Sequence, residues 1–380
     1  MDFELGEDLT MVRDMAREFA DKELAPRATK HDREETIDPA VFAGLAELGL
    51  WGLTIPEEYG GAGMDNLSLA LVLEELNRAC ASTGVTVSVH NSLMGAPVLK
   101  WGSEEIKRQW LPKLATGELI GAYCLTEANA GSDAASLATT ARREGDEYVI
   151  TGNKLFVTNG AEAGLFIVYA RTDDTAPKAR GISAILVPRE TAGLEIGKTE
   201  KKTGIRGSST VEVILNDVRV PVGNLIGEEN RGFHVAMDTL DGGRIGIAAQ
   251  AVGIGRACLE ASVKYSKERE QFGKPIGHFQ AIQWKLADMA TQLEAARMLL
   301  RRAAWLRDRG ESCTQEAAQA KLYASRTANF CADEAVQIHG GAGYTDDFHV
   351  ERLFRDARIT EIYEGATDIQ RLVIARCLLA

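Results

Sequence analysis

The sequence predicts an α+β protein of several domains, in which helical domains at both ends flank a middle β domain of the antiparallel barrel or sandwich type. Three observations predict this architecture. The chain of 380 residues is longer than one hydrophobic core normally organises. Strand-like runs are confined to the middle of the chain, and long apolar seams of helical period follow them. We expect the domains to span residues 1–120, 121–231 and 232–380.

The composition is that of an ordinary globular protein, with 45% hydrophobic and 26% charged residues. A formal net charge of -12 argues against a general nucleic-acid binder. The six cysteines are scattered without a Cys-x-x-Cys pair, which predicts reduced thiols rather than disulfides or a zinc knuckle. No run of eighteen apolar residues and no targeting signal are present, so we expect a cytoplasmic protein without a membrane span, or a mitochondrial matrix protein if the chain is a processed form.

Helical patterning fills the chain from Leu9 to about Cys124. The run Leu67–Leu76 is apolar on nearly every side, which predicts a helix buried in the core. Prolines and a glycine-rich turn divide the pattern into several helices of ordinary length. We expect breaks at Pro26, Pro56, Gly60–Gly63, Pro97 and Pro112.

Short runs of β-branched and apolar residues, separated by Gly, Asn and Asp, predict the β domain. Helical crossovers are missing between the runs, and neither a Gly-x-Gly-x-x-Gly after a strand nor a Walker loop is present. NAD and ATP therefore lack their usual sequence motifs. The expected strands are Tyr148–Ile150, Lys154–Thr158, Leu165–Ala170, Gly181–Val187 and Thr210–Leu215.

The C-terminal part carries long helical seams. Between residues 282 and 303 apolar side chains recur at steps of four and three, which predicts a helix of about 30 residues in a bundle. A similar stripe between residues 233 and 258 contains one charged member, Arg244. Because an unpaired buried charge costs several kcal/mol, we expect Arg244 to face an anion, either Glu364 or a ligand beside it. The alternative is a helix break at Gly242-Gly243 that lets Arg244 reach solvent.

Glu364 is the candidate catalytic residue. It lies between Tyr363 and the flexible Gly365, where removal of water would raise its pKa toward that of a working base. The alternative is that Glu364 starts the last helix, because acidic residues are favoured in a first turn.

Other segments suit a polar ligand. Gly121–Asp133 is a strand followed by a loop of small and hydroxyl-bearing residues, and alternation in the next strand places Phe156 and Thr158 on one face. Arg269–Lys274 and Val336–Gly343 are basic and glycine-rich elements suited to a pyrophosphate. Plain turns and an amphipathic strand would look the same. We expect no metal site at Asp346–His349, because a di-iron bundle needs two Glu-x-x-His units and further glutamates.

Five of these segments together resemble the acyl-CoA dehydrogenase family over essentially the whole chain. They are Tyr123-Cys-Leu-Thr-Glu-Ala-Asn-Ala-Gly-Ser-Asp133, Lys154-Leu-Phe-Val-Thr-Asn-Gly160, Arg269-Glu-Gln-Phe-Gly-Lys274, Gln337-Ile-His-Gly-Gly341 and Ile362-Tyr-Glu-Gly365. The resemblance implies an N-terminal helical domain, a middle β domain and a C-terminal four-helix bundle. It also implies a homotetramer, arranged as a dimer of dimers, with FAD held between domains and across a subunit interface.

The resemblance further implies which residues hold the cofactor. Leu125 and Thr126 would bond the pyrimidine side of the flavin, Thr158 would approach N5, and Phe156 would stack on the ring. Residues of a neighbouring subunit would serve part of the ADP half. The full set of expected FAD-binding residues is Tyr123, Leu125, Thr126, Gly131, Ser132, Phe156, Val157, Thr158, Arg269, Phe272, Gln280, Gln337, Ile338, Gly340, Gly341, Ala366 and Asp368.

By the same resemblance, Glu364 would remove the α-proton of an acyl-CoA thioester while the β-hydrogen leaves as hydride to flavin N5, and electron-transferring flavoprotein would accept the electrons. Ser132, Asp241, Arg244, Tyr363 and Gly365 would contact the substrate. Some relatives carry the base immediately before the arginine that corresponds to Arg244, where this chain has Gly243, so Glu364 is the expected base. Together with Leu240–Gln250, this arrangement is most similar to the short-chain, or butyryl-CoA, branch.

Two departures from the family pattern concern the cofactor. Ala366 replaces a frequent threonine, and Ala128-Asn129 replaces a frequent Pro-Gly. Alternatives to a short-chain dehydrogenase are a dehydrogenase for branched, cyclic or aromatic acyl-CoA and an oxygen-using acyl-CoA oxidase or flavin monooxygenase of the same fold. A scaffold that has kept the fold without FAD is a further alternative.

Overall fold

The structure is a computed structural model and describes residues 4–380. Its N-terminal part is helical, and local capping fixes where several helices begin. Asp65 accepts a hydrogen bond from the Ser68 amide, and Ser103 accepts one from the Ile106 amide, which satisfies amides left free at a helix start. The helices are α1 (Glu7–Phe19), α2 (Ala28–Glu34), α3 (Pro39–Glu47), α4 (Asn66–Ala79), α5 (Ala81–Val89), α6 (Ala96–Trp101) and α7 (Glu104–Ala115).

Two of the predicted helix breaks are wrong. A π-helical segment, His90–Gly95, joins α5 directly to α6, so the helical path continues through Pro97 and the proline directly follows the π-helical turn. Pro112 lies inside α7, in its last turn. The prediction for α4 is confirmed, because side chains on all its faces, including Leu69, Leu73 and Leu76, are buried.

The middle part forms one eight-stranded sheet in the order β6-β7-β3-β2-β4-β5-β8, with β1 paired to β4. The pairs are antiparallel except that β1 and β2 run parallel to β4. The two strands predicted at Tyr148–Ile150 and Lys154–Thr158 are a single strand, β3, whose pairing with β7 shifts register twice. The bounds are β1 (Ile120–Cys124), β2 (Thr140–Glu144), β3 (Glu147–Thr158), β4 (Ala163–Arg171), β5 (Ile182–Pro188), β6 (Leu194–Thr199), β7 (Thr210–Pro221) and β8 (Leu225–Ile226).

Long helices form the C-terminal part. Helix α8 (Gly232–Glu268) runs unbroken through Gly242 and Gly243, contrary to the alternative of a break there. A small hairpin, β9 (Glu270–Gln271) and β10 (Lys274–Pro275), leads to α9 (Gln280–Asp308), whose predicted seam lies in or against the core. The remaining helices are α10 (Thr314–His339), α11 (Val350–Arg358) and α12 (Thr367–Leu379).

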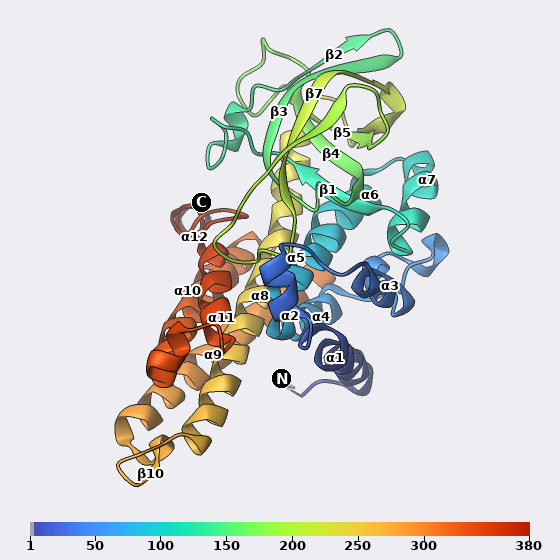
Figure 1. The fold of residues 1–380 in the computed structure, drawn as a ribbon. Helices are drawn as coiled ribbons and strands as arrows, with labels where there is room; N and C mark the ends of the chain where they lie inside the picture. The colour runs from blue at the N-terminus through green and yellow to red at the C-terminus, as the bar shows by residue number, and fades with distance from the viewer. Residues whose placement is uncertain (1–3) are drawn as a thin grey trace.

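Helix α8 connects the layers. Figure 1 shows it running from the sheet at the top of the molecule down among the long helices, with the N-terminal helices on one side and the red C-terminal helices on the other. A continuous core joins α4 and α5 to α8, α9 and α10, and a second core joins the N-terminal helices to the sheet. None of the helices within residues 4–380 is long and apolar enough to span a bilayer.

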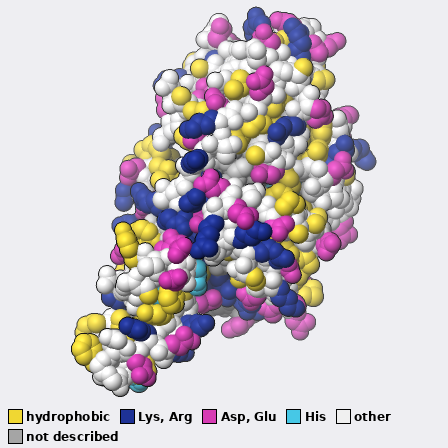
Figure 2. Space-filling view, viewed as in Figure 1, with side chains coloured by type: hydrophobic (Ala, Val, Ile, Leu, Met, Phe, Trp, Pro, Cys, Tyr) yellow, Lys and Arg dark blue, Asp and Glu magenta, His cyan; other side chains and the backbone are white. Residues whose placement is uncertain are grey.

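A cluster of charges lies where α2, residues 203–207 and α11 meet, and we call it the junction cluster. Arg355 pairs with Asp32 at 2.7 Å and with Glu351 at 2.8 Å. The buried Asp356 carboxylate accepts a hydrogen bond from the Ile205 amide, which ties α11 to the loop before β7. On the face seen in Figure 2, basic side chains gather across the middle of the molecule. The residues of the junction cluster are Asp32, Arg33, Arg206, Asp346, Glu351, Arg352 and Arg355.

Candidate active site

Glu364 lies on the short segment between α11 and α12, three residues before α12 begins. Glu364 and Gly365 both have left-handed backbones, with φ of 50° and 96°. This conformation costs a non-glycine residue about 1–2 kcal/mol, so surrounding groups must hold it. Lys321 Nζ donates to the Gly365 carbonyl at 2.8 Å, and Gln370 Nε2 donates to the carbonyls of Glu364 and Gly365 at 3.1 and 2.8 Å.

The Glu364 carboxylate is in the state expected of a base. Although the residue as a whole is half-buried, its Oε2 atom is buried and has no hydrogen-bond partner. Burial raises the pKa of Glu364 to about 7, against the lowering effects of the Lys321 and Arg244 charges. A carboxylate with this pKa can both accept and release a proton near neutral pH.

Gly243 makes room for this carboxylate. A Cβ atom at position 243 would lie 1.9 Å from Glu364 Oε2 and 2.9 Å from Leu93 Cδ2, both far inside van der Waals contact. The glycine on α8, Glu364 and Leu93 of the π-helical segment therefore face one another. Leu93 was not among the residues predicted from sequence, because its helix carries no polar motif.

Arg244 is buried, with 5% of its surface exposed, as the stripe on α8 predicts. Its ion-pair partner is different from the one expected. Arg244 Nη1 pairs at 2.6 Å with Asp241, one turn earlier on the same helix, and Asp241 also accepts a hydrogen bond from Thr314. The prediction of Glu364 as the paired anion is thus wrong, although the Arg244 charge still lowers the pKa of Glu364.

Two tyrosines complete the surroundings of Glu364. Tyr363 donates its hydroxyl hydrogen to Gln250 of α8, and Gln250 in turn donates to the Ala81 carbonyl at 3.3 Å. Burial, followed by the Glu364 charge, raises the pKa of Tyr363. Tyr123 of β1 stacks at a tilt on Tyr169, and its pKa is raised by burial, by Tyr169 and by Glu364. Residues from β1, α8, α10 and the α11–α12 segment therefore meet here.

A second group lies around the end of β1 and the bulge in β3. Phe156 has a left-handed backbone, with φ of 56°, and 61% of its surface is exposed. This bulge interrupts the alternation from which Phe156 and Thr158 were expected to share a face. Thr126 lies beside it, because the Thr126 carbonyl accepts a hydrogen bond from the Leu155 amide at 2.9 Å.

This second group fits an aromatic ring with polar edges. An exposed phenyl ring on a strained backbone next to a threonine is unusual on a water-facing surface and natural against a ring. The following loop is open, since a Cβ at Gly131 would meet no atom within 4 Å and Ser132 is exposed. The side chains of Leu125 and Val157 are buried, so these two residues can offer only backbone groups.

A buried ion pair supports the same loop. Lys154 of β3 has no exposed surface, and its Nζ lies 2.7 Å from Glu127 Oε1 and 3.3 Å from the Leu125 carbonyl. Glu127 also accepts hydrogen bonds from the amides of Ala138 and Thr139. The pair fixes the start of the loop against the sheet.

The third predicted group lies at the other end of α8. Arg269 follows the last residue of α8, Phe272 lies in the turn of the β9–β10 hairpin, and Gln280 begins α9. Residues 337–339 end α10, and Gly340 and Gly341 follow it. Helix α8 has 37 residues and is therefore about 55 Å long, and Figure 1 shows β10 and the sheet at opposite ends of the molecule. One chain therefore does not bring this group to Phe156. Phe272 is 93% exposed, whereas the Ile338 side chain is buried in the core.

The last two predicted cofactor residues lie at the start of α12. Ala366 is the residue before the helix and offers no capping side chain. Asp368 is exposed and pairs with Arg371 at 2.7 Å. Within residues 4–380, no cluster of three or more His, Cys, Asp or Glu side chains is placed to hold a metal.

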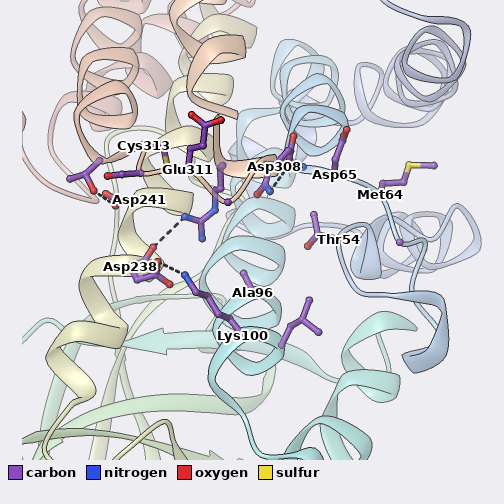
Figure 3. Close-up of a pocket in the computed structure, with 17 residues that line it drawn as sticks. Thr54, Met64, Asp65, Ala96, Lys100, Asp238, Asp241, Asp308, Glu311 and Cys313 are labelled. Atoms are coloured by element: carbon purple, nitrogen blue, oxygen red, sulfur yellow. Dashed lines mark hydrogen bonds and ion pairs between the residues drawn. The ribbon is translucent and has the colours of Figure 1, made fainter. Parts of the chain in front are cut away.

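A cavity of about 760 Å³ lies between α6, α8 and the α9–α10 connection. Figure 3 shows the residues that line it. Lys100 and Asp238 pair across it at 2.7 Å, and Asp241 lies in its wall. Asp241 is the only predicted site residue that lines it, and Glu364 does not. More carboxylates than basic groups line the cavity. No sequence motif predicted a site there. The charged residues that line it are Asp65, Lys100, Asp238, Asp241, Arg307, Asp308 and Glu311.

Comparison with known proteins is unambiguous about family. Three family models match the chain: "Acyl-CoA dehydrogenase, N-terminal domain" over residues 6–118, the middle domain over 122–218 and the C-terminal domain over 230–379. The mitochondrial short-chain specific acyl-CoA dehydrogenase of Mus musculus is 51% identical over 99% of this chain and 91% of its own length. A probable acyl-CoA dehydrogenase of Bacillus subtilis is 50% identical over 100% of both chains.

Solved structures agree with this. Butyryl-CoA dehydrogenase from Megasphaera elsdenii superimposes with a TM-score of 0.98 at 44% identity, over 100% of both chains. A chain from a structural study of the electron transferring flavoprotein of Acidaminococcus fermentans has a TM-score of 0.98 at 47% identity, also over 100% of both chains.

Proposed function

The chain belongs to the acyl-CoA dehydrogenase family, a family of FAD-dependent oxidoreductases, and from this premise we propose that it dehydrogenates a short-chain acyl-CoA thioester to the trans-2-enoyl-CoA with Glu364 as the base. One observation carries the assignment of the base. Glu364 has a buried, unpartnered carboxylate oxygen on a strained segment, with its pKa raised to about 7. A group that only began a helix would need none of these features.

Glu364 in its ionised form accepts the α-proton of the thioester. Exclusion of water from the carboxylate strengthens its basicity, and the Lys321 and Arg244 charges keep enough of it ionised at neutral pH. The α-proton is too weakly acidic for an ordinary carboxylate, so the thioester carbonyl must be polarised. The Glu364 amide makes no hydrogen bond to any residue of the described chain, and it is the donor that we assign to this carbonyl.

FAD, when bound, supplies the two-electron acceptor for the β-hydrogen. The residues that we assign to its ring are Phe156, Thr158, Thr126 and the backbone of Leu125, supported by the open bulge and loop described above. We also assign Tyr123, Gly131, Ser132 and Val157 to this side of FAD, and Ala366 and Asp368, at the start of α12, would hold its diphosphate. The role of the protein here is to exclude water and to fix the ring against the substrate.

The ADP half of FAD requires a neighbouring subunit in this proposal. Arg269, Phe272, Gln280, Gln337, Ile338, Gly340 and Gly341 are separated from Phe156 by the length of α8, so another copy of the chain must supply them. Exposure of 93% of Phe272 supports this, because a large apolar side chain is normally covered. These features support contact with a second copy of the chain, and we propose the homotetramer, built as a dimer of dimers, that the resemblance to the family implies. We propose domains at residues 1–120, 121–231 and 232–380.

A short acyl chain is supported by the relatives, several of which are named short-chain specific acyl-CoA dehydrogenases. Leu93 of the π-helical segment lies close to Gly243 and offers an apolar side chain beside Glu364. We assign Ser132, Asp241, Arg244, Tyr363 and Gly365 to the substrate. Electron transferring flavoprotein is the proposed electron acceptor, since a chain of high similarity comes from a study of that protein.

The test is an anaerobic titration of the purified yellow protein with saturated acyl-CoA esters from propionyl to palmitoyl, together with isobutyryl, isovaleryl and benzylic esters. We expect bleaching of the oxidised flavin bands, greatest with butyryl-CoA. Preferential bleaching by a branched or long ester would remove the short-chain assignment. A flavin that no ester bleaches, or that reoxidises rapidly in oxygen with product bound, would favour the oxygen-using alternative.

A further inference from the structure

Lys321 is a buried lysine that no motif marked and that directly supports the segment carrying Glu364. It has no exposed surface, and it lies in the N-terminal half of α10. Its Nζ donates at 2.8 Å to the Gly365 carbonyl, the peptide next to the candidate base. Burying an ammonium group is costly unless it interacts with negative charge, so a lysine in this position needs an explanation.

The charges around Lys321 supply one. Burial lowers the pKa of Lys321 to about 8, while Glu364 and Glu361 act to raise it, so the side chain still carries its charge at neutral pH. Among the charges acting on Glu364, that of Lys321 has the largest effect and exceeds that of Arg244. Arg244 is already paired with Asp241 at 2.6 Å, whereas the Lys321 ammonium bonds only a neutral carbonyl.

The backbone contacts point the same way. Gln370 Nε2 and Lys321 Nζ both donate to the Gly365 carbonyl at 2.8 Å, so one of them would suffice to satisfy it. A neutral donor would then hold the turn without the cost of burying a charge. The presence of a lysine at this second position is explained if its charge is used.

We propose that Lys321 is a positioning residue for the dehydrogenation: it holds the Glu364–Gly365 segment and places a positive charge that favours the ionised, proton-accepting form of Glu364. The proposal rests on the assignment of Glu364 as base. The other titratable and charged groups that face this pair are Arg244 with Asp241 on α8, Tyr123 on β1, Glu361 before Glu364, and Tyr363.

The test compares Lys321→Met and Lys321→Gln with Gln370→Met and Glu364→Gln, all as FAD-loaded enzyme. Both Lys321 variants remove the charge. Lys321→Gln also keeps a hydrogen-bond donor at this position, so it serves as the second variant if Lys321→Met does not fold. Gln370→Met is the matched structural control, because it removes a donor to the same carbonyl without changing charge. The rate of flavin reduction by butyryl-CoA is measured across pH. The carbonyl infrared band of protonated Glu364 is titrated in the resting enzyme by difference against Glu364→Gln.

We expect both Lys321 variants to titrate Glu364 about one pH unit higher than wild type, in the rate profile and in the infrared band. At pH 7 the ionised fraction would then fall about fivefold, and the rate would recover at higher pH. Gln370→Met would lower the rate without moving the pH midpoint. Lys321 variants whose midpoint stays at the wild-type pH overturn the proposal, even if they are slow. Glu364→Gln that reduces flavin normally would instead overturn the assignment of the base.

Discussion

Replacement of Gly243 by alanine tests the geometry around Glu364 most sharply. The new Cβ would lie 1.9 Å from Glu364 Oε2, whereas carbon and oxygen atoms that are not bonded stay about 3.3 Å apart. The carboxylate must therefore move by about 1.4 Å. Since a displacement of about 1 Å at a reacting group can cost about 10²-fold in rate, we expect Gly243→Ala to reduce its flavin about 100 times more slowly than wild type.

The fold should tolerate this change. Overpacking costs about 1–3 kcal/mol, and alanine in place of glycine within a helix returns about 1 kcal/mol. Gly242→Ala is the matched control, because its Cβ would lie 3.1 Å from the end of the flexible Arg307 side chain. The assay is single-turnover flavin reduction by butyryl-CoA, with the free energy of unfolding measured in parallel. If Gly243→Ala reduced its flavin at a rate within about threefold of the Gly242→Ala rate, the close approach of position 243 to the base would be refuted.

Two further predictions concern other parts of the molecule. Burial raises the pKa of Asp356 from 3.8 to about 6, so its stabilising contribution is complete below about pH 4 and is lost as pH rises through 6. Wild type should therefore lose about 2 kcal/mol relative to Asp356→Asn between pH 4 and pH 7, measured by urea unfolding, and a difference independent of pH would contradict this. Phe156→Gly should relieve the left-handed backbone and leave the apoprotein as stable or more stable by about 1 kcal/mol, while FAD affinity measured by fluorescence falls. Unchanged FAD affinity would remove Phe156 from the flavin site.

The three-part architecture could be predicted from sequence because each part has its own hydrophobic period. The α9 seam and the buried helix α4 follow from counting apolar residues, and both are confirmed. The positions of helix breaks and the continuity of strands depend on contacts that the hydrophobic period does not encode. Pro97 does not end the helix, because α5 continues through a π-helical segment into α6. Strand β3 stays one strand, because it remains paired with β7 on both sides of its register shifts.

The same limit applies to the site. The buried Arg244 could be predicted, since one charge on an apolar stripe is visible in sequence, yet its partner could not. Asp241 lies only one turn away and competes successfully with the more distant Glu364. Lys321 left no trace in sequence, because its partner is a backbone carbonyl 44 positions further along the chain. When the partner of a buried charge is a backbone group, the sequence contains no complementary residue, so the interaction cannot be predicted from it.

The most direct test of the central claim is anaerobic stopped-flow reduction of the flavin by butyryl-CoA in wild type and in Glu364→Gln, with the exposed Glu294→Gln as control. We predict that wild type and the control reduce flavin at similar rates that rise with pH through a midpoint near 7 to a plateau above about 8, as the pKa of Glu364 requires. Glu364→Gln should retain FAD and bind the ester but reduce flavin slower by several orders of magnitude. Reduction by Glu364→Gln at a rate near that of wild type would contradict the account.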